Sequence, residues 1–156
     1  MKNNDVIRRI RYIFDFSDYK MIDIFELANH KVTRAEISDW LKKDDNPDYK
    51  EISDKYLAIF LNGFINDKRG KKEGDQAEPE EKLDNNMIFR KLRIALNLKD
   101  QDILDILKLA NMEISKHELS AFFRNPTSRK YRQCKAQILR NFLHGMQIKY
   151  CPTQSK

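Results

Sequence analysis

The stretch NNDVIRRIRYIF, residues 3–14, returns 82 positions further along the chain as NNMIFRKLRIAL, residues 85–96. The same offset aligns residues 3–65 with residues 85–147 without a gap and gives 17 identical pairs over 63 positions. Chance would give roughly four identities over such a length, so the repeat is a strong signal. The chain is therefore a tandem duplication of one unit of about 65 residues.

The identical pairs run along the whole unit and include polar, charged and glycine positions. They include Asn4 with Asn86, Arg8 with Arg90, Arg11 with Arg93, Asp18 with Asp100, Asn29 with Asn111, Tyr49 with Tyr131 and Gly63 with Gly145.

The spacing of apolar residues predicts helices in both copies. Val6, Ile7, Ile10, Ile13 and Phe14 gather on one side of a helix with about 100° per residue. The chain holds only four glycines and four prolines, which favours helices over a sheet with frequent turns. We predict an all-α fold, a tandem duplication of a four-helix unit. The second and third helices of each unit would form a helix-turn-helix-like pair.

Capping signals recur at equivalent positions of the two copies. The third helix of each copy opens with a capping box, in which a hydroxyl and a carboxylate satisfy the first free backbone amides. The residues are Thr33 with Glu36 and Ser115 with Glu118. Asn3 or Asn4 is expected to cap the first helix. Asn29 and Asn111 stand where a left-handed residue would end the second helix.

Gly63 and Gly145 lie inside the fourth helix of each copy, where a glycine costs about 1 kcal/mol relative to alanine. A glycine retained at this position in both copies predicts a close helix–helix approach. A single unit has a small core and would be marginally stable alone. We therefore expect the two copies to pack together and to bury Trp40 and several Phe side chains.

The domain organisation follows from the repeat. We predict copy one at residues 1–70, an acidic linker at 71–84, copy two at 85–150 and a tail at 151–156. The linker reads KKEGDQAEPEEKLD and shows no hydrophobic periodicity. The N-terminus has no apolar run typical of a signal peptide, and no stretch suits a membrane span. We therefore predict a cytoplasmic protein without membrane contact, whose two cysteines stay reduced.

Several segments together resemble a known family. They are Asn4-Asp5-x-Ile7-Arg8-x-x-Arg11-Tyr12, Phe60-Leu61-Asn62-Gly63, Lys68-Arg69-Gly70, Asn85-Asn86, Lys91-Leu92-Arg93-Ile94-Ala95 and Asp102-Ile103-Leu104. With these segments the whole chain resembles the YehS-like family, bacterial proteins built of two copies of a domain of unknown function. The resemblance implies a helical, cytoplasmic bacterial protein. It implies no activity, and no catalytic or binding residue is carried over from it.

Positive charge is concentrated in the second copy. Residues 1–70 hold 13 basic and 13 acidic residues, whereas residues 85–156 hold 14 basic and 5 acidic residues. No acidic residue follows Glu118. A surface of one sign attracts phosphate, and an aromatic ring within it can stack on a base. The candidate nucleic-acid-binding residues are Arg124, Arg129, Lys130, Tyr131, Arg132, Lys135 and Arg140.

A helix covering Lys116 to Arg124 would be the one to enter a groove of DNA. The first copy places Glu36 and Asp39 in the corresponding helix, where phosphate would be repelled. If nucleic acid binds, we expect the second copy to dominate. The alternative is a solvated basic face, or a face that docks on the acidic linker of the same chain.

Four arginines recur in the first helices and have two interpretations. Each is either a member of a structural ion pair at a helix edge or part of an anion site. They are Arg8, Arg11, Arg90 and Arg93. Arg11 would pair with Asp18 or Asp23, and Arg93 with Asp100 or Asp105.

No catalytic or metal-binding arrangement stands out. His30, His117 and His144 lack the spacing of metal ligands, so we expect no metal and no cofactor. Cys134 lies among Arg132, Lys135 and Arg140, which would lower the pKa of its thiol, and a pairing with His117 or His144 is conceivable. A partly buried helical cysteine is the simpler interpretation. The lack of a recognisable acid–base arrangement argues against an enzyme.

The leading functional prediction is a non-enzymatic binding module with a protein-interaction or adaptor role. Tyr12, Phe16 and Tyr19 are candidate exposed aromatics for a protein partner or a homo-oligomer. Phe16 and Tyr19 are replaced by Leu98 and Gln101, so this surface would belong to copy one. The alternative is binding of DNA or RNA through the basic surface of the second copy.

Overall fold

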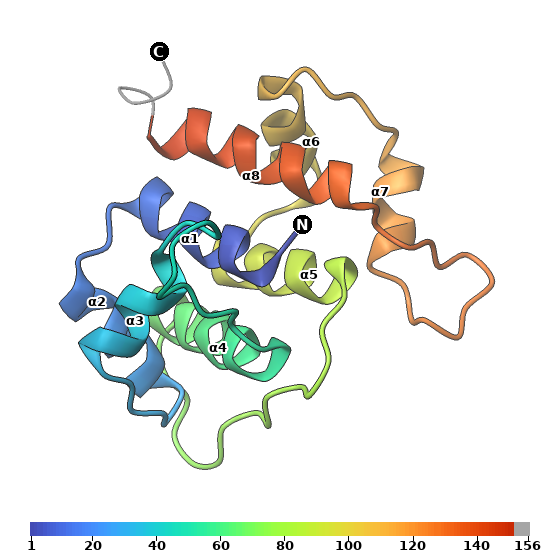
Figure 1. Cartoon of the computed structure of the whole chain (residues 1–156). Helices are drawn as coiled ribbons and strands as arrows, with labels where there is room; N and C mark the ends of the chain where they lie inside the picture. Colours follow the sequence, from blue (N-terminus) through green and yellow to red (C-terminus); the bar gives the residue numbers. More distant parts are fainter. Residues whose placement is uncertain (152–156) are drawn as a thin grey trace. The chain divides into compact units, whose positions relative to one another are not determined.

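The computed structural model describes residues 1–151 and is helical throughout, with no strand in that range (Figure 1). Two compact units divide the chain, unit 1 at Met1–Leu83 and unit 2 from Asp84 onward. Unit 1 contains α1 (Asn3–Phe14), α2 (Asp18–Leu27), α3 (Arg34–Leu41) and α4 (Asp54–Arg69). Unit 2 contains α5 (Asn85–Ala95), α6 (Asp100–Leu109), α7 (Lys116–Phe122) and α8 (Ala136–Tyr150).

The predicted all-α tandem duplication is confirmed, since each unit repeats the same order of four helices. That the two copies pack together stays a prediction. Of the predicted tail, only Cys151 lies among the described residues. None of the helices in residues 1–151 is long and apolar enough to cross a membrane.

The predicted linker makes contacts with unit 1. The backbone amide of Leu83 donates to Asp54 Oδ2 at 2.9 Å. Lys55 Nζ lies 3.3 Å from a carboxylate oxygen of Glu81, and both side chains are largely exposed. The segment after α4 therefore returns to the first turn of that helix before unit 2 begins.

An aromatic cluster fills the core of unit 1. The ring centroid of Phe25 in α2 lies 5.6 Å from that of Trp40 in α3 and 5.5 Å from that of Phe60 in α4. The indole of Trp40 also lies 5.5 Å from the ring of Tyr56. Trp40 is thus buried by contacts inside its own unit. In unit 2, Phe89 takes the central place and lies 4.6 Å from Phe142.

The two helical glycines mark a close helix–helix approach in each unit, as the sequence predicts. A Cβ atom on Gly63 of α4 would lie 1.9 Å from the carbonyl oxygen of Ile24 in α2. A Cβ atom on Gly145 of α8 would lie 2.0 Å from the carbonyl oxygen of Ile106 in α6. No side chain fits at either position, so the backbones of these helix pairs meet directly.

Most predicted caps are confirmed. The hydroxyls of Thr33 and Ser115 accept from the amides of Glu36 and Glu118, at 3.1 and 3.0 Å. Asn29 and Asn111 adopt the expected left-handed conformation, with φ of 60° and 59°. A second equivalent pair of left-handed residues follows the first helix of each unit and was not predicted. These residues are Asp15 and Asn97.

The predicted capping role of Asn3 or Asn4 is wrong. The N-cap residues of α1 and α5 are Lys2 and Asp84, and the asparagines lie inside the first helical turn. Asn4 is buried and reaches across the unit instead. Its Nδ2 donates to the carbonyls of Trp40 and Lys50 at 2.9 and 2.8 Å, and its Oδ1 accepts from the amide of Ile52 at 3.1 Å.

Candidate nucleic-acid interface

Asn86 holds the loop between α7 and α8 in place in the way that Asn4 holds its counterpart. Asn86 Nδ2 donates to the carbonyls of Phe122 and Arg132 at 3.1 and 2.8 Å. Asn86 Oδ1 accepts from the amide of Cys134 at 2.8 Å. We call residues 123–135 the basic loop. One buried amide group of α5 thus fixes both the start and the end of this loop.

The basic loop is also braced from within. Asn125 Oδ1 accepts from the amide of Thr127 at 3.0 Å, and Ser128 Oγ accepts from the amide of Lys130 at 3.2 Å. Arg132 Nη1 donates to the carbonyls of Arg129 and Tyr131, both at 2.8 Å. A loop without regular structure is therefore held by its own side chains.

Five exposed cations stand on this loop. None of them forms an ion pair with a carboxylate within residues 1–151. They are Arg124, Arg129, Lys130, Arg132 and Lys135. Tyr131, in the same loop, is half-buried. Arg140 is exposed on α8, where it donates to Gln137 Oε1 at 2.8 Å. The structure thus places six of the seven predicted residues on one loop and the seventh on the following helix.

The equivalent loop of unit 1, residues 41–53, has a different charge. It carries three lysines and four acidic residues, a net charge of −1, against five basic and no acidic residues in the basic loop. Lys42 and Lys50 both pair with Asp39, at 2.8 and 3.6 Å. Every acidic residue of the unit 1 loop has a neutral or basic counterpart in unit 2. The replacements are Asp44 by Pro126, Asp45 by Thr127, Asp48 by Lys130 and Glu51 by Gln133.

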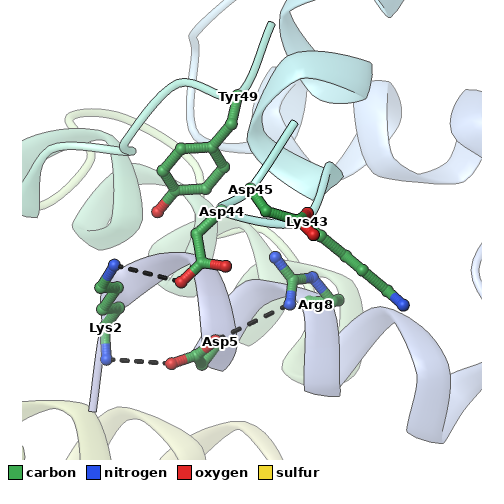
Figure 2. Close-up of a pocket in the computed structure, with 7 residues that line it drawn as sticks. All are labelled: Lys2, Asp5, Arg8, Lys43, Asp44, Asp45 and Tyr49. Atoms are coloured by element: carbon green, nitrogen blue, oxygen red, sulfur yellow. Dashed lines mark hydrogen bonds and ion pairs between the residues drawn. The ribbon is translucent and has the colours of Figure 1, made fainter. Parts of the chain in front are cut away.

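The unit 1 loop and α1 enclose a hollow of about 250 Å³ with mixed charge (Figure 2). Its lining residues are Lys2, Asp5, Arg8, Lys43, Asp44, Asp45 and Tyr49. Lys2 Nζ lies 3.5 Å from Asp44, and Arg8 Nη1 lies 3.8 Å from Asp5. Arg8 Nε and the hydroxyl of Tyr49 are buried without a hydrogen-bond partner among the described residues.

In unit 2 the arginine and the tyrosine of this hollow recur as Arg90 and Tyr131, its three carboxylates are replaced, and Asp84 stands at the position of Lys2. Met87 replaces Asp5, so Arg90 lacks the acidic neighbour that Arg8 has. Arg90 is exposed and donates to the carbonyl of Phe123 at 3.2 Å. Burial and the nearby negative charge of Asp84 raise the pKa of the Tyr131 hydroxyl, and the charge of Arg90 acts in the opposite direction. Arg90 therefore adds a sixth cation beside the basic loop.

The start of α8 contributes further positive potential. Lys135 stands at the N-cap, makes no capping hydrogen bond with its side chain, and is followed by a first turn without an acidic residue. In α4 the hydroxyl of Ser53 accepts from the amide of Tyr56 at 3.2 Å, and Asp54 lies in the first turn. Free amides at a helix N-terminus favour negative charge. The basic loop thus leads into an uncapped helix end.

Arg11 and Arg93 are engaged in equivalent ion pairs. Arg11 lies 2.9 Å from Asp18, and Arg93 lies 2.9 Å from Asp100. A hydrogen bond from Arg34, aided by Arg11, lowers the pKa of the Asp18 carboxyl. These geometries support a structural role at the junction between the first two helices of each unit.

The predicted groove-entering helix is shorter than expected. α7 ends at Phe122, so Arg124 lies outside the helix and belongs to the basic loop. Its seven residues carry Glu118 in the first turn, where DNA phosphates would come closest. Helix α7 is therefore not the positively charged helix that would suit a groove of DNA.

Of the two interpretations of Cys134, a pKa lowered by neighbouring cations is wrong, and the simpler one, a buried cysteine, is nearer, although Cys134 lies before α8 and not inside it. Its thiol is buried just before α8, and this burial raises its pKa to about 12. The neighbouring cations are exposed, and Cys134 occupies the position that Ile52 has in unit 1. Cys134 acts as a small apolar residue of the core. His117 and His144 are both exposed.

The exposed aromatics are fewer than predicted. Tyr12 and Tyr19 are 45% and 71% exposed, but Phe16 is only 9% exposed and stacks on Phe14 at 5.7 Å. Ile94 stands at the position of Tyr12 in unit 2 and is 46% exposed. An apolar side chain thus protrudes at the same place in both units.

Two features of the interface were not predicted from the sequence. The first is the placement of Arg90 beside Tyr131, and the second is the clamp that Asn86 makes on the loop. The only signal for either was the recurrence of these residues in the first copy, as Arg8, Tyr49 and Asn4.

Comparison with known proteins finds both a family model and a similar protein. A family model described as "Protein of unknown function (DUF1456)" matches the chain twice, over residues 3–70 and 85–151. The uncharacterized protein YehS of Escherichia coli strain K12 is 40% identical over 147 residues, which cover 94% of either chain. No solved structure matches the chain.

Proposed function

Because this chain belongs to the DUF1456 family, whose function is unknown, we propose its function from the geometry of unit 2: it binds nucleic acid through the basic loop. The observation that carries the proposal is the set of five exposed cations on residues 123–135 that have no acidic partner within residues 1–151. Cations without partners release the counterions of phosphates when they bind, and this release drives nucleic-acid association. Nucleic-acid binding is the second of the two functions expected from the sequence.

The difference in charge between the two loops indicates that the positive charge of the basic loop serves a function. The scaffold is the same, and the buried asparagine makes three equivalent hydrogen bonds in each unit. The loops nevertheless differ by six charges, from −1 in residues 41–53 to +5 in residues 123–135. A merely solvated surface needs no such one-sided replacement, because mixed charges serve solubility equally well.

The bracing of the basic loop also favours binding. A ligand that meets an ordered surface loses less free energy in ordering loops and side chains. The hydrogen bonds from Asn86 and within the loop hold the backbone in place before any ligand arrives. The uncapped start of α8 adds amide donors next to Lys135.

Fluorescence anisotropy with labelled DNA and RNA oligonucleotides at low salt tests the proposal. The triple variant Arg129→Gln, Lys130→Gln, Arg132→Gln should weaken binding by on the order of tenfold or more, because each lost cation leaves a phosphate unneutralised. The matched control is Lys42→Gln, Lys43→Gln, Lys50→Gln, which removes three charges from the unit 1 loop. The control should bind like the unchanged protein. Equal weakening in both triple variants, or no binding by the unchanged protein, would contradict the proposal.

A protein-interaction role is the second candidate, and the protruding Tyr12, Tyr19 and Ile94 favour it. Exposed apolar side chains at equivalent positions suit a partner or a second copy of the chain. If the chain self-associates through these side chains, sedimentation analysis should show a dimer for the unchanged protein. The double variant Tyr12→Ser, Ile94→Ser should then be a monomer. A monomer across the accessible concentration range would remove self-association from consideration.

A further inference from the structure

Arg8 and Tyr49 in unit 1 have different neighbours from their equivalents in unit 2, Arg90 and Tyr131. In unit 1, Arg8 is half-buried, Asp5 lies 3.8 Å from it, and the carboxylates of Asp44 and Asp45 line the same hollow as Tyr49 (Figure 2). In unit 2 the equivalent Arg90 is exposed. The three carboxylates of the hollow are thus replaced in unit 2, which leaves Arg90 open to an external anion, and Asp84, at the position of Lys2, is the acidic group near Tyr131.

In unit 1, Arg8 Nη2 donates to the carbonyl of Lys42 at 2.8 Å, but two other donors of the pair lack acceptors. Arg8 Nε and the hydroxyl of Tyr49 are buried and make no hydrogen bond among the described residues, although carboxylates line the hollow. In unit 2 the only acceptor that Arg90 has within residues 1–151 is the carbonyl of Phe123. A guanidinium offers five donors, so Arg90 keeps most of its donors for a ligand.

Resting on the proposed function, we infer that unit 2 takes single-stranded nucleic acid and that Arg90 and Tyr131 hold one nucleotide of it. Arg90 receives a phosphate through its guanidinium, which suits bidentate contacts with phosphate oxygens. Tyr131 receives the base on its ring, flanked by Lys130 and Arg132 for the neighbouring phosphates. Cations that follow the backbone around an aromatic ring are the usual arrangement for binding single strands.

The geometry disfavours a duplex as the main ligand. The cations stand on an irregular loop, and a major groove is read by a helix or a two-stranded ribbon. The adjoining helix α7 has seven residues and carries Glu118 in its first turn. Paired bases are stacked inside a duplex and are not available to the ring of Tyr131. A single strand can present both a phosphate and an open base to the pair.

Two measurements with the full chain test this inference. The first compares a single-stranded oligonucleotide of mixed sequence with its duplex, in equal salt, by anisotropy. The second repeats both titrations with Tyr131→Ala, Tyr131→Phe and Arg90→Gln, and with Tyr49→Ala and Arg8→Gln as matched controls in unit 1. We expect tighter binding of the single strand. Tyr131→Ala should weaken it roughly 5- to 150-fold, corresponding to the stacking of one base, whereas Tyr131→Phe should retain it.

The outcomes separate this inference from the proposed function. Equal, salt-dependent binding of single strand and duplex would overturn the single-strand inference and leave the basic loop as a nucleic-acid site. The single-strand inference also fails if Tyr131→Ala and Tyr49→Ala change single-strand affinity equally. No binding of either oligonucleotide at low salt would overturn both. Circular dichroism of each variant identifies any that fails to fold. If Tyr131→Ala does not fold, Tyr131→Phe, which should keep single-strand binding, is compared with Arg90→Gln, which should weaken it.

Discussion

At the scale of single residues, a buried asparagine in each unit joins segments that lie far apart in the sequence. Asn4 and Asn86 each form three hydrogen bonds with backbone groups that lie 36 to 48 positions away in the sequence. Buried backbone groups require partners, and a side chain from the first helix supplies them where the long loop has no regular structure. The asparagine therefore converts an irregular loop into a fixed part of the fold.

Replacement of either asparagine should be costly. Asn4→Ala and Asn86→Ala each leave two carbonyls and one amide without a partner, so we expect a loss of about 2–4 kcal/mol in the free energy of unfolding. Urea denaturation followed by circular dichroism measures the loss. Gln133→Ala, an exposed change in the same loop, is the control and should alter stability by less than about 0.5 kcal/mol. A difference of under about 1 kcal/mol between Asn86→Ala and the control would argue against the clamp.

The thiol of Cys134 should be protected from reagents. With a pKa of about 12 it holds almost no thiolate at about pH 8.5, so in a Cys151→Ser variant maleimide labelling should be slow in buffer and fast in urea. Because burial raises this pKa above its ordinary 9.0, the thiol's contribution to stability is complete below about pH 9 and is lost as the pH rises towards 12. Labelling in buffer at the rate found in urea would show that Cys134 is exposed.

Residue-level features were the least predictable from the sequence. An asparagine at the start of a helix looks the same whether it caps that helix or reaches a distant loop, so the role of Asn4 was predicted wrongly. The cations beside Cys134 in the sequence suggested a low pKa, but the Cys134 side chain is buried whereas these cations are exposed. The capping boxes were predictable because they involve only local contacts.

At the scale of elements, the glycine contacts fix how close the second and fourth helices of each unit come. Their backbones meet where Gly63 faces Ile24 and where Gly145 faces Ile106. The repeat made this predictable, since a glycine in a helix interior is unfavourable unless space requires it. The end of α7 was not predictable, because nothing in the sequence after Phe122 stops a helix before Pro126.

Because of these glycine contacts, replacing either glycine by alanine should lower the stability of the protein, the opposite of the usual effect in a helix. An alanine in place of a helical glycine normally stabilises a protein by up to about 1 kcal/mol. Here a Cβ atom would overlap a backbone carbonyl, so Gly63→Ala and Gly145→Ala should each destabilise by roughly 3 kcal/mol or more. Thermal unfolding compares them with Lys55→Ala, an exposed change in α4. An unchanged or higher melting temperature in either glycine variant would refute the close approach.

At the scale of the whole molecule, duplication supplied two equivalent scaffolds whose surfaces diverged. Residues 1–70 are neutral overall, whereas residues 85–156 carry an excess of nine basic residues. The difference was visible in the sequence, and so was the predicted set of basic residues. Their closeness follows from their adjacency in the sequence, whereas the bracing of the loop by Asn86 and the addition of Arg90 from α5 required the structure.

Unneutralised cations of unit 2 are expected to drive binding, and the salt dependence of affinity tests this most directly. The dissociation constant for a single-stranded oligonucleotide is measured at several salt concentrations for the unchanged protein and the Arg129→Gln, Lys130→Gln, Arg132→Gln variant. With about five or six phosphate contacts, the logarithm of the binding constant should fall with a slope of about −4 against the logarithm of the salt concentration, and about −2 in the variant. A slope near zero, or the same slope in both proteins, would contradict a binding mode that depends on these cations.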